Sequence, residues 1–351
     1  MRAMITFVAT ASHQYAIRDV LETRSHPLHG KIVILNHQEF LASRRLPRSA
    51  YIIVDLERLS VEDARRVDAR LDALVRACPD CLVLNLPSRI GTRQDIMRRL
   101  HEGGINDFRM MPITADPGMV RYPVFLRRDD DHEGPKSDLL ETPQALRDAI
   151  AALDPRDRQL GRFVITEYVD ARNVNGLHEK RSYTRVGDRL FPSAMDQSRG
   201  WVCKGEYSDP ATVSDPVREL AFFNENADNA TLRKAFDLAG IDYGRADYAV
   251  IGGRPQIFEI NTNPWIEPPE RVPAISRRGA EHIVAAWLSA LEHLAAQAAT
   301  QDPAWIEVAE ASGKLPRRLS RRDVVHAALR GLGKLHYETR AMRVLRRLRL
   351  L

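Results

Sequence analysis

The chain has 351 residues, of which 44% are hydrophobic and 28% charged, so it can bury a sizeable core. No apolar run approaches the length of a membrane-spanning helix, and the apolar stretch at residues 5–10 is too short for the core of a signal peptide. The three cysteines are an odd number, which argues against a disulfide framework and favours a reducing compartment. We therefore expect a cytoplasmic protein.

The formal net charge of +5 is unevenly distributed. Residues 311–351 carry twelve Lys and Arg against two acidic residues, a net charge of +10, so the rest of the chain carries −5. From about residue 316 apolar side chains recur at helical spacing among the arginines. We expect residues 301–351 to form a basic helical tail. Such a tail can contact an acidic partner, nucleic acid or an anionic membrane surface, or pack on the main body with a solvated basic face.

Strand-like and helix-like patterns alternate over the N-terminal third of the chain. Strands are expected at residues 5–10, 31–36, 51–56 and 81–86, and helices at 16–22, 38–44, 61–77 and 92–101. This alternation predicts an α/β domain with a parallel sheet covered by helices, which we place at residues 1–112. No Gly-x-Gly-x-x-Gly follows the first strand, so a Rossmann nucleotide site has no support there.

The middle of the chain predicts further strands and helices. Strands are expected at 122–128 and 162–170, with an acidic loop at 129–135 and a helix at 144–153 between them. A hairpin over 178–191 should turn at Gly187-Asp188, with Lys180, Ser182 and Thr184 on one face. One long helix is expected at 220–238 and another at 279–299.

Residues 240–264 predict a second hairpin, with two alternating runs around a Gly-Gly turn. If Gly252, Gly253 and Arg254 form the connection, Ile251 faces Pro255 and Asp247 faces Glu259. A two-residue loop would slip the register and send the two carboxylates to opposite faces. The apolar pattern favours the three-residue loop. It gives a polar face of Arg245, Asp247, Glu259 and Asn261, and a core face of Ala246, Tyr248, Val250, Phe258 and Ile260.

Two carboxylates and an amide oxygen on rigid strands are the kind of ligands that Mg²⁺ prefers. Arg245 beside them is suited to stabilising negative charge on a transferred phosphoryl group or a tetrahedral intermediate. The alternative is a solvated hairpin whose polar face happens to be acidic.

The residues also carry a resemblance to a known family. Gly-Arg-Ala-Asp at 244–247, followed by Glu-Ile-Asn-Thr-Asn-Pro at 259–264, resembles the metal-binding end of the ATP-grasp superfamily, which includes D-alanine–D-alanine ligase, glutathione synthetase and the ribosomal-protein glutamate ligases. The resemblance implies that Asp247, Glu259 and Asn261 bind the magnesium ions of ATP and that Arg245 assists at the reacting carboxyl. It also implies an α+β ATP-grasp fold, with subdomains at 113–170 and 171–300 gripping ATP.

The resemblance extends, with departures, to the phosphate-binding elements. In the family, the strand matching 122–128 ends in a lysine that reaches the ATP phosphates, and a glycine-rich loop follows. Here Arg127 occupies the lysine's place, and the loop contains three consecutive acids, His132 and a single glycine, Gly134. His132 is a candidate contact for phosphate or substrate. A second lysine, expected near residue 92, is absent, and the nearest cation is Arg93. Arginine is not equivalent to lysine.

The resemblance implies roles for further residues. Backbone groups of Glu167, Tyr168 and Val169 would bind the adenine, and Asp170 would take the ribose hydroxyls. Lys180 would face the phosphates or the acyl intermediate, while Trp201 and Lys204 would line the acceptor pocket. After Pro264 the sequence departs from the D-alanine ligases, so their substrate is not carried over.

The family implies an ATP-dependent carboxylate–amine ligase with ATP and Mg²⁺ as cofactors and an acylphosphate intermediate. The carboxylate and the amine would be small molecules or peptides. A kinase of the same fold and a non-catalytic scaffold that binds a partner through the basic tail are the alternatives, and a homodimer remains open.

Overall fold

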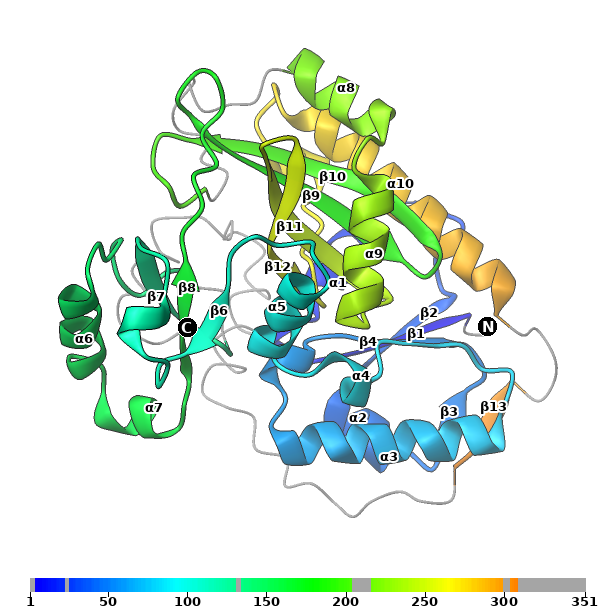
Figure 1. Cartoon of the computed structure of the whole chain (residues 1–351). Helices are drawn as coiled ribbons and strands as arrows, with labels where there is room; N and C mark the ends of the chain where they lie inside the picture. The colour runs from blue at the N-terminus through cyan, green and yellow to red at the C-terminus, as the bar shows by residue number, and fades with distance from the viewer. Residues whose placement is uncertain (1–3, 23–24, 131–133, 204–215, 299–303, 309–351) are drawn as a thin grey trace.

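The computed structural model describes residues 4–22, 25–130, 134–203, 216–298 and 304–308 (Figure 1). The N-terminal domain contains a four-stranded parallel sheet of order β2-β1-β4-β5, as the alternating pattern predicts. Its strands are β1 (Ile5–Ala9), β2 (Ile32–Asn36), β4 (Ala50–Ile53) and β5 (Val83–Leu84).

Helices cover this sheet, and the longest has the bounds that its sequence predicts. This helix, α3 (Val61–Ala77), begins where the Ser60 hydroxyl accepts a 3.1 Å hydrogen bond from the backbone N–H of Asp63. Its buried residues Val67, Leu71 and Leu74 recur at helical spacing and face the sheet core. The other elements of this region are η1 (Ala11–His13), α1 (Tyr15–Leu21), α2 (His37–Ala42), η2 (Leu56–Arg58), α4 (Pro87–Ile90) and α5 (Arg93–Glu102).

A second, smaller unit lies to the left in Figure 1 and contains an antiparallel sheet of order β6-β8-β7. It has a core of its own, which includes Val124, Leu126, Leu146 and Ile165. Its elements are β6 (Met110–Pro112), η3 (Pro117–Met119), β7 (Val124–Arg128), α6 (Pro143–Ala151), α7 (Pro155–Gln159) and β8 (Phe163–Glu167).

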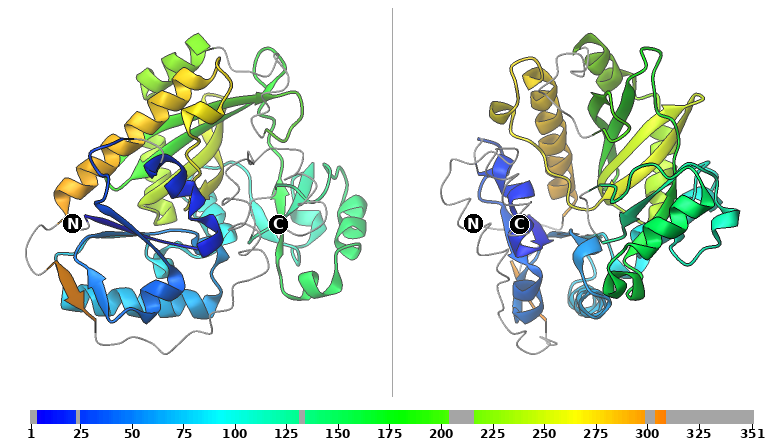
Figure 2. Two further views of the ribbon diagram at one scale, coloured as in Figure 1. Left: turned by 180° about the vertical axis from the view of Figure 1, so that it is seen from behind. Right: turned by 90° about the vertical axis from the view of Figure 1, so that its left-hand side faces the viewer.

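The third unit is built on an antiparallel sheet of order β10-β9-β11-β12, seen from two further sides in Figure 2. The hairpin of β9 and β10 turns at Gly187-Asp188, as predicted. The elements of this unit are β9 (His178–Val186), β10 (Arg189–Ser198), α8 (Pro216–Glu225), α9 (Asn229–Ala239), β11 (Tyr243–Ile251), β12 (Arg254–Asn261), η4 (Pro269–Arg271) and α10 (Arg277–Gln297).

The single helix predicted for residues 220–238 is wrong, because the chain forms two helices there. Asn226 adopts a left-handed φ of 49°, a conformation that no helix interior tolerates, and its carbonyl accepts the N–H of Asn229 at 3.1 Å. No Gly or Pro marks the break, which is why the pattern alone does not reveal it.

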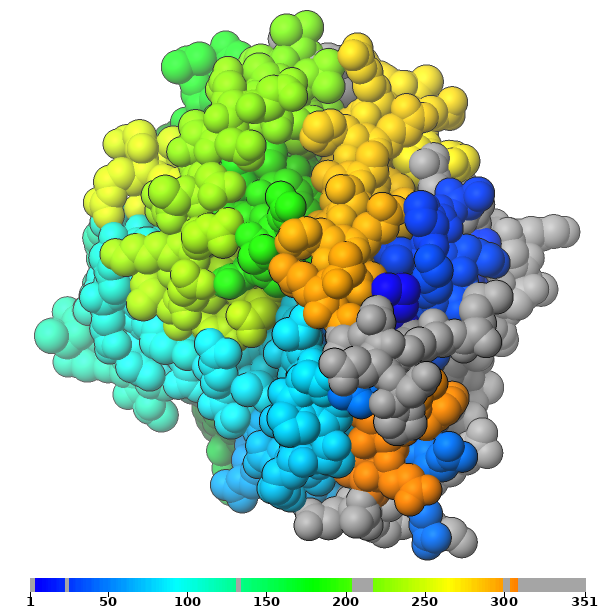
Figure 3. All heavy atoms as spheres, turned by 90° about the vertical axis from the view of Figure 1, so that its right-hand side faces the viewer, coloured from blue at the N-terminus to red at the C-terminus, as the bar shows by residue number. Residues whose placement is uncertain are grey.

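Helix α10 joins the N-terminal domain to the third unit. The indole Nε1 of Trp287 donates to the Tyr243 hydroxyl of β11 at 3.2 Å, and the Phe7 ring of β1 meets the same Tyr243 ring edge-on, with 5.6 Å between centroids. Figure 3 shows α10 in orange between the green third unit and the blue N-terminal segment. None of the described helices is both long and apolar enough to cross a lipid bilayer.

After α10 the chain returns to the N-terminal domain, where β13 (Trp305–Glu307) pairs antiparallel with β3 (Arg45–Pro47). The described start of the predicted tail is therefore a strand. Residues 309–351, which hold the basic segment, lie outside the described residues.

Asn85 connects the parallel sheet to the third unit. Its side-chain Nδ2 donates to the carbonyls of Ile53 at 3.0 Å and Tyr243 at 2.7 Å, and its Oδ1 accepts the N–H groups of Asp242 at 2.8 Å and Tyr243 at 3.0 Å. Asn85 is fully buried and has a left-handed φ of 66°. This one side chain holds the start of β11 against β4.

Candidate active site

The hairpin of β11 and β12 brings Asp247 opposite Glu259 and Arg245 opposite Asn261, as predicted, but by a different route. The predicted three-residue connection is wrong. Gly252 and Gly253, with φ of 56° and 76°, form a two-residue turn, and Ile251 pairs with Arg254. A bulge between the Tyr248–Ile257 and Asp247–Glu259 pairs adds Phe258 and restores the register.

A residue far from the hairpin in sequence holds the strand beside this bulge. Asn106 Oδ1 accepts the backbone N–H of Ile257 at 2.8 Å, and Asn106 Nδ2 donates to the Ile257 carbonyl at 2.9 Å. Asn106 is 2% exposed, so these bonds are sheltered from water. The pairing of Asp247 with Glu259 across the hairpin thus depends on the tertiary contact of Asn106 as well as on the turn.

Asp247 lies in a buried, positively charged setting. Its Oδ2 lies 3.2 Å from Lys180 Nζ, and its Oδ1 accepts from the Ser182 hydroxyl at 2.9 Å and from Arg245 Nε at 3.2 Å. Burial alone would raise the pKa of Asp247, but Lys180 and Arg245 outweigh it and lower that pKa. Burial likewise opposes the charge of Lys180, whose pKa is nevertheless raised by Asp247 and Asp196.

Glu259 is contacted by cations from both other units. Arg127 Nη2 of β7 lies 2.6 Å from Glu259 Oε2, and Arg93 Nη2 of α5 lies 3.6 Å from the same oxygen. Burial, followed by the neighbouring Arg127, lowers the pKa of Arg93. The two arginines that the sequence resemblance aligned with lysines therefore meet at Glu259, a predicted metal ligand. Sequence spacing does not reveal this convergence.

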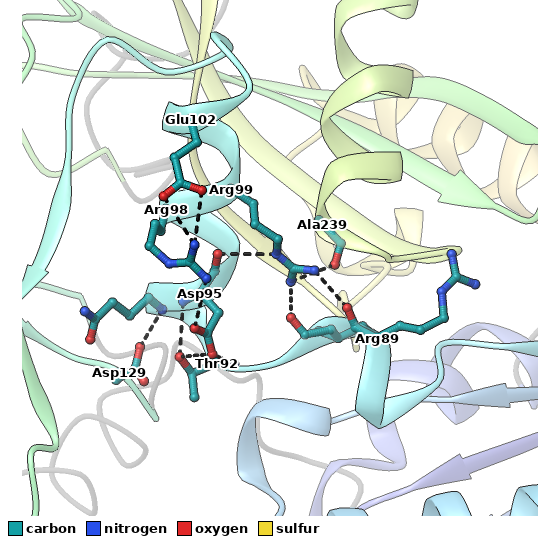
Figure 4. A network of polar contacts seen from close by, with 10 residues as sticks. Arg89, Thr92, Asp95, Arg98, Arg99, Glu102, Asp129 and Ala239 are labelled. Carbon is teal, nitrogen blue, oxygen red and sulfur yellow. Dashed lines mark hydrogen bonds and ion pairs between the residues drawn. The ribbon is translucent and has the colours of Figure 1, made fainter.

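The start of α5, which carries Arg93, is anchored by hydrogen bonds of Thr92, Asp95 and Asp129 (Figure 4). Thr92 and Asp95 form a capping box, with the Thr92 N–H donating to Asp95 Oδ2 at 3.0 Å and the Asp95 N–H to Thr92 Oγ1 at 3.2 Å. The Arg93 guanidinium donates from Nη1 to the Arg128 carbonyl at 2.7 Å, while Asp129 accepts the N–H of Gln94 at 2.9 Å.

Two acids of the loop after β7 are engaged by the protein. Asp129 binds the backbone of α5, and Asp130 accepts from Arg128 Nε at 2.8 Å. Both carboxylates therefore have partners within the fold, and the charge of Asp130 is balanced by Arg128. Gly134 has a left-handed φ of 90°, and His132 lies outside the described residues.

Three oxygen donors of the hairpin fit a magnesium ion. Asn261 Oδ1 is buried without a hydrogen-bond partner in the described structure, and its Nδ2 donates to Glu259 Oε1 at 3.1 Å. An unpaired buried acceptor beside two carboxylates suits a hard cation. No group of three His, Cys, Asp or Glu side chains in the described ranges is arranged to hold a metal, so the third protein ligand would be this amide.

The residues predicted to bind adenine have structural partners. Glu167 Oε1 accepts from Arg109 Nη2 at 2.6 Å and from the Arg121 N–H at 2.8 Å. Burial opposes its charge, but the hydrogen bond from Arg109 and those from the two backbone amides lower the pKa of Glu167. The backbone N–H of Glu167 donates to Arg109 and that of Tyr168 to Pro123. Adenine binding at Glu167, Tyr168 and Val169 stays a prediction.

Trp201 packs beside two aromatic residues of the smaller unit. Its ring centroid lies 5.0 Å from that of Phe125 on β7 and 6.1 Å from that of Tyr168. Asp170, predicted to bind ribose, is paired with Arg172, and this pairing lowers the pKa of Asp170 to about 2. Lys204 lies outside the described residues. Trp201, predicted to line the acceptor pocket, thus lies beside Tyr168, one of the residues predicted to bind adenine.

The sequence interpretation missed the residues that the N-terminal domain brings to the site. Thr262, directly after Asn261, accepts the N–H of Leu56 at 3.1 Å and donates to Glu57 Oε2 at 2.7 Å. Glu57 belongs to η2, in the loop after β4. Loops at the carboxyl ends of parallel strands are common ligand sites, a rule that could have identified them.

No family model matches the sequence, and neither does any curated protein sequence. Solved structures do. D-alanine–D-alanine ligase from Bacillus anthracis matches over 84% of this chain and 98% of its own, with a TM-score of 0.51 and 12% identity. The same enzyme complexed with ATP gives a TM-score of 0.49 at 12% identity over the same shares. A RimK domain ATP-grasp protein from Sphaerobacter thermophilus DSM 20745 gives 0.44 at 17% identity, over 81% of this chain and 98% of its own. The chain has the ATP-grasp fold.

Proposed function

We propose that the protein is an ATP-dependent ligase that joins a carboxylate to an amine through an acylphosphate. The observation that carries the proposal is the meeting of all three units at one hairpin face. Asp247, Glu259 and Asn261 offer oxygen ligands there, while Arg127 and Arg93 arrive from two other elements.

The charges at this face of the β11–β12 hairpin suit a nucleoside triphosphate. Lys180 and Arg245 lie against Asp247, and Arg127 and Arg93 lie against Glu259. Lys180 also pairs with Asp196 at 3.5 Å, so four cations meet three carboxylates. Excess positive charge favours polyanionic ligands. When bound, Mg²⁺ would neutralise phosphate oxygens as the phosphoryl group moves, with Asp247, Glu259 and Asn261 as its ligands.

The side chains around the hairpin have two further proposed roles, phosphate binding and oxyanion stabilisation. Lys180 and the two arginines bind and orient phosphate oxygens as the substrate carboxylate takes the γ-phosphoryl group and ADP leaves. Arg245 is placed to stabilise the oxyanion that forms when the amine attacks the acyl carbon. The carbonyl of Trp265 accepts from Arg245 Nη1 at 3.3 Å, which fixes the guanidinium beside Asp247.

The test is incubation of the full chain with Mg-ATP, hydroxylamine and a panel of amino-acid carboxylates. Carboxylate-dependent release of ADP and phosphate together with an acyl hydroxamate is the expected result. A stable phosphorylated product would instead identify a kinase of the same fold. Failure to bind Mg-ATP in calorimetry would overturn the proposal in favour of a scaffold.

A further inference from the structure

A histidine–aspartate pair lies at the carboxyl edge of the parallel sheet, next to the segment that leaves the metal hairpin. His13 ends η1, in the loop after β1, and Asp55 follows β4. His13 Nδ1 lies 3.3 Å from Asp55 Oδ1, and the two side chains are 11% and 3% exposed. The pair is therefore largely withdrawn from water.

Asp55 is fixed in the orientation that this contact needs. Its Oδ2 accepts the backbone N–H of Thr10 at 2.8 Å, so both carboxylate oxygens face the loop after β1. Asp55 also has a left-handed φ of 60°, which costs a non-glycine residue free energy and often accompanies function. With the carboxylate on Nδ1, the neutral imidazole holds its proton there and Nε2 becomes the basic nitrogen.

Contacts through the segment after β12 connect the His13–Asp55 pair to Arg245, the residue proposed to stabilise the oxyanion. Asn263 Nδ2 donates to the His13 carbonyl at 3.2 Å. The Tyr15 ring lies between the rings of His13 and Trp265, with centroids 6.1 and 6.4 Å away. Trp265 in turn accepts from Arg245 through its carbonyl.

An unpaired acceptor lies in the same place. Asn263 Oδ1 is buried and has no hydrogen-bond partner in the described structure. A buried acceptor without a donor is costly, so such an atom in a site often marks the place of a ligand N–H or O–H. An amine substrate supplies that donor.

We propose that His13, oriented by Asp55, is the general base for the attacking amine, which Asn263 Oδ1 helps to bind. This inference rests on the proposed ligase function. The amine nitrogen forms a bond to the acyl carbon, and the bond from that carbon to the phosphate oxygen breaks, releasing inorganic phosphate. The proton lost by the nitrogen goes to His13 Nε2 and then to solvent.

Several other titratable groups surround the pair and enter any pH profile. Arg58 lies 3.9 Å from Asp55. The negative charges of Asp55, Glu57 and Asp63 interact electrostatically with His37. Tyr15 contacts His13, and Asp19 binds the Trp265 indole at 3.3 Å. The carboxylate of Asp55 is bonded to the His13 ring.

The test compares two nucleophiles on His13→Gln. Hydroxylamine is largely unprotonated at neutral pH and can attack without first losing a proton, whereas an amino-acid amine is protonated at that pH and must lose a proton before it attacks. We expect His13→Gln to lower kcat/KM for the amine by about 10²–10⁴-fold, as loss of a general base does, and to leave hydroxamate formation unchanged. In wild type kcat/KM for the amine should fall at acid pH, and this limb should vanish in the variant.

Two further variants keep the result interpretable. Asp55→Asn should shift the imidazole ¹⁵N signals away from the Nδ1–H tautomer and lower amine transfer, while the Thr10 contact can persist. His29→Gln, at an exposed histidine of the same domain, is the matched control and should change nothing. Equal loss of both products in His13→Gln, or an unchanged pH profile, would overturn the role of His13. Absence of hydroxamate in wild type would instead refute the ligase function itself, and the proposed base with it.

Discussion

Arg127 of β7 donates a 2.6 Å hydrogen bond from Nη2 to Oε2 of Glu259 on β12, and so links the smaller unit to the β11–β12 hairpin. The two side chains are 10% and 17% exposed. Because the phosphates of a nucleotide would compete for the same guanidinium, this pair couples ligand binding to the relative placement of the two units.

Replacing Arg127 with Ala should reduce both stability and nucleotide affinity. Removing one partner of a buried ion pair costs about 3–5 kcal/mol. Since Arg93 still lies 3.6 Å from Glu259 and the pair is not fully buried, we expect about 2–3 kcal/mol in urea unfolding. Weaker Mg-ATP binding should appear in calorimetry. Arg254→Ala, which breaks an exposed pair with Asp107, should cost no more than about 1 kcal/mol and leave ATP binding intact.

Asn85→Ala should be among the most destabilising single changes in the chain. It removes four hydrogen bonds and leaves buried backbone groups of Ile53, Asp242 and Tyr243 without them, at about 1–3 kcal/mol for each unsatisfied group. Asn85→Gly keeps the left-handed backbone without strain and should be less harmful than Asn85→Ala. Equal losses in urea unfolding would show that the backbone conformation contributes little.

Glu167 should make stability depend on acid pH. Its pKa is lowered in the folded protein from the usual value of 4.5, despite burial, by Arg109 and backbone amides. Its contribution is therefore present above about pH 4.5 and is lost as pH falls through the lowered pKa. In Glu167→Gln the thermal midpoint should be lower at neutral pH and should fall less steeply in acid. Glu141→Gln, at an exposed site of the same unit, should follow wild type.

Glu219 should make stability depend on pH in the opposite direction. Burial, with a smaller effect of Asp196, raises its pKa to about 7 from 4.5. The stability it contributes is complete below about pH 4.5 and is lost as pH rises through about 7. Glu219→Gln should therefore gain in thermal midpoint relative to wild type between these values and keep the gain at pH 8. An exposed residue of the same helix, Glu225, provides the control; if Glu225→Gln behaves likewise, burial of Glu219 is not the cause.

Local patterns of the sequence predict much of the fold. Alternation with periods of 2 and 3.6 is a property of neighbouring residues, so α3, the parallel strands, the Gly187-Asp188 turn and α10 are all predictable. The spacing of Asp247, Glu259 and Asn261 likewise identifies the polar face. The break at Asn226 is not predictable from the pattern, because no Gly or Pro marks it and only the backbone conformation interrupts the helix.

The remaining features depend on contacts between distant segments. A two-residue turn alone would place Asp247 and Glu259 on opposite faces. The bulge at Phe258, next to Ile257, which Asn106 binds, brings them back together. Arg93 and Arg127 meet at Glu259 only because α5 and β7 belong to different units packed on one hairpin. Sequence determines which side chains each strand and helix presents, since local geometry sets their direction. Tertiary packing determines which of them meet, because hydrogen bonds and buried charges act across space irrespective of chain separation.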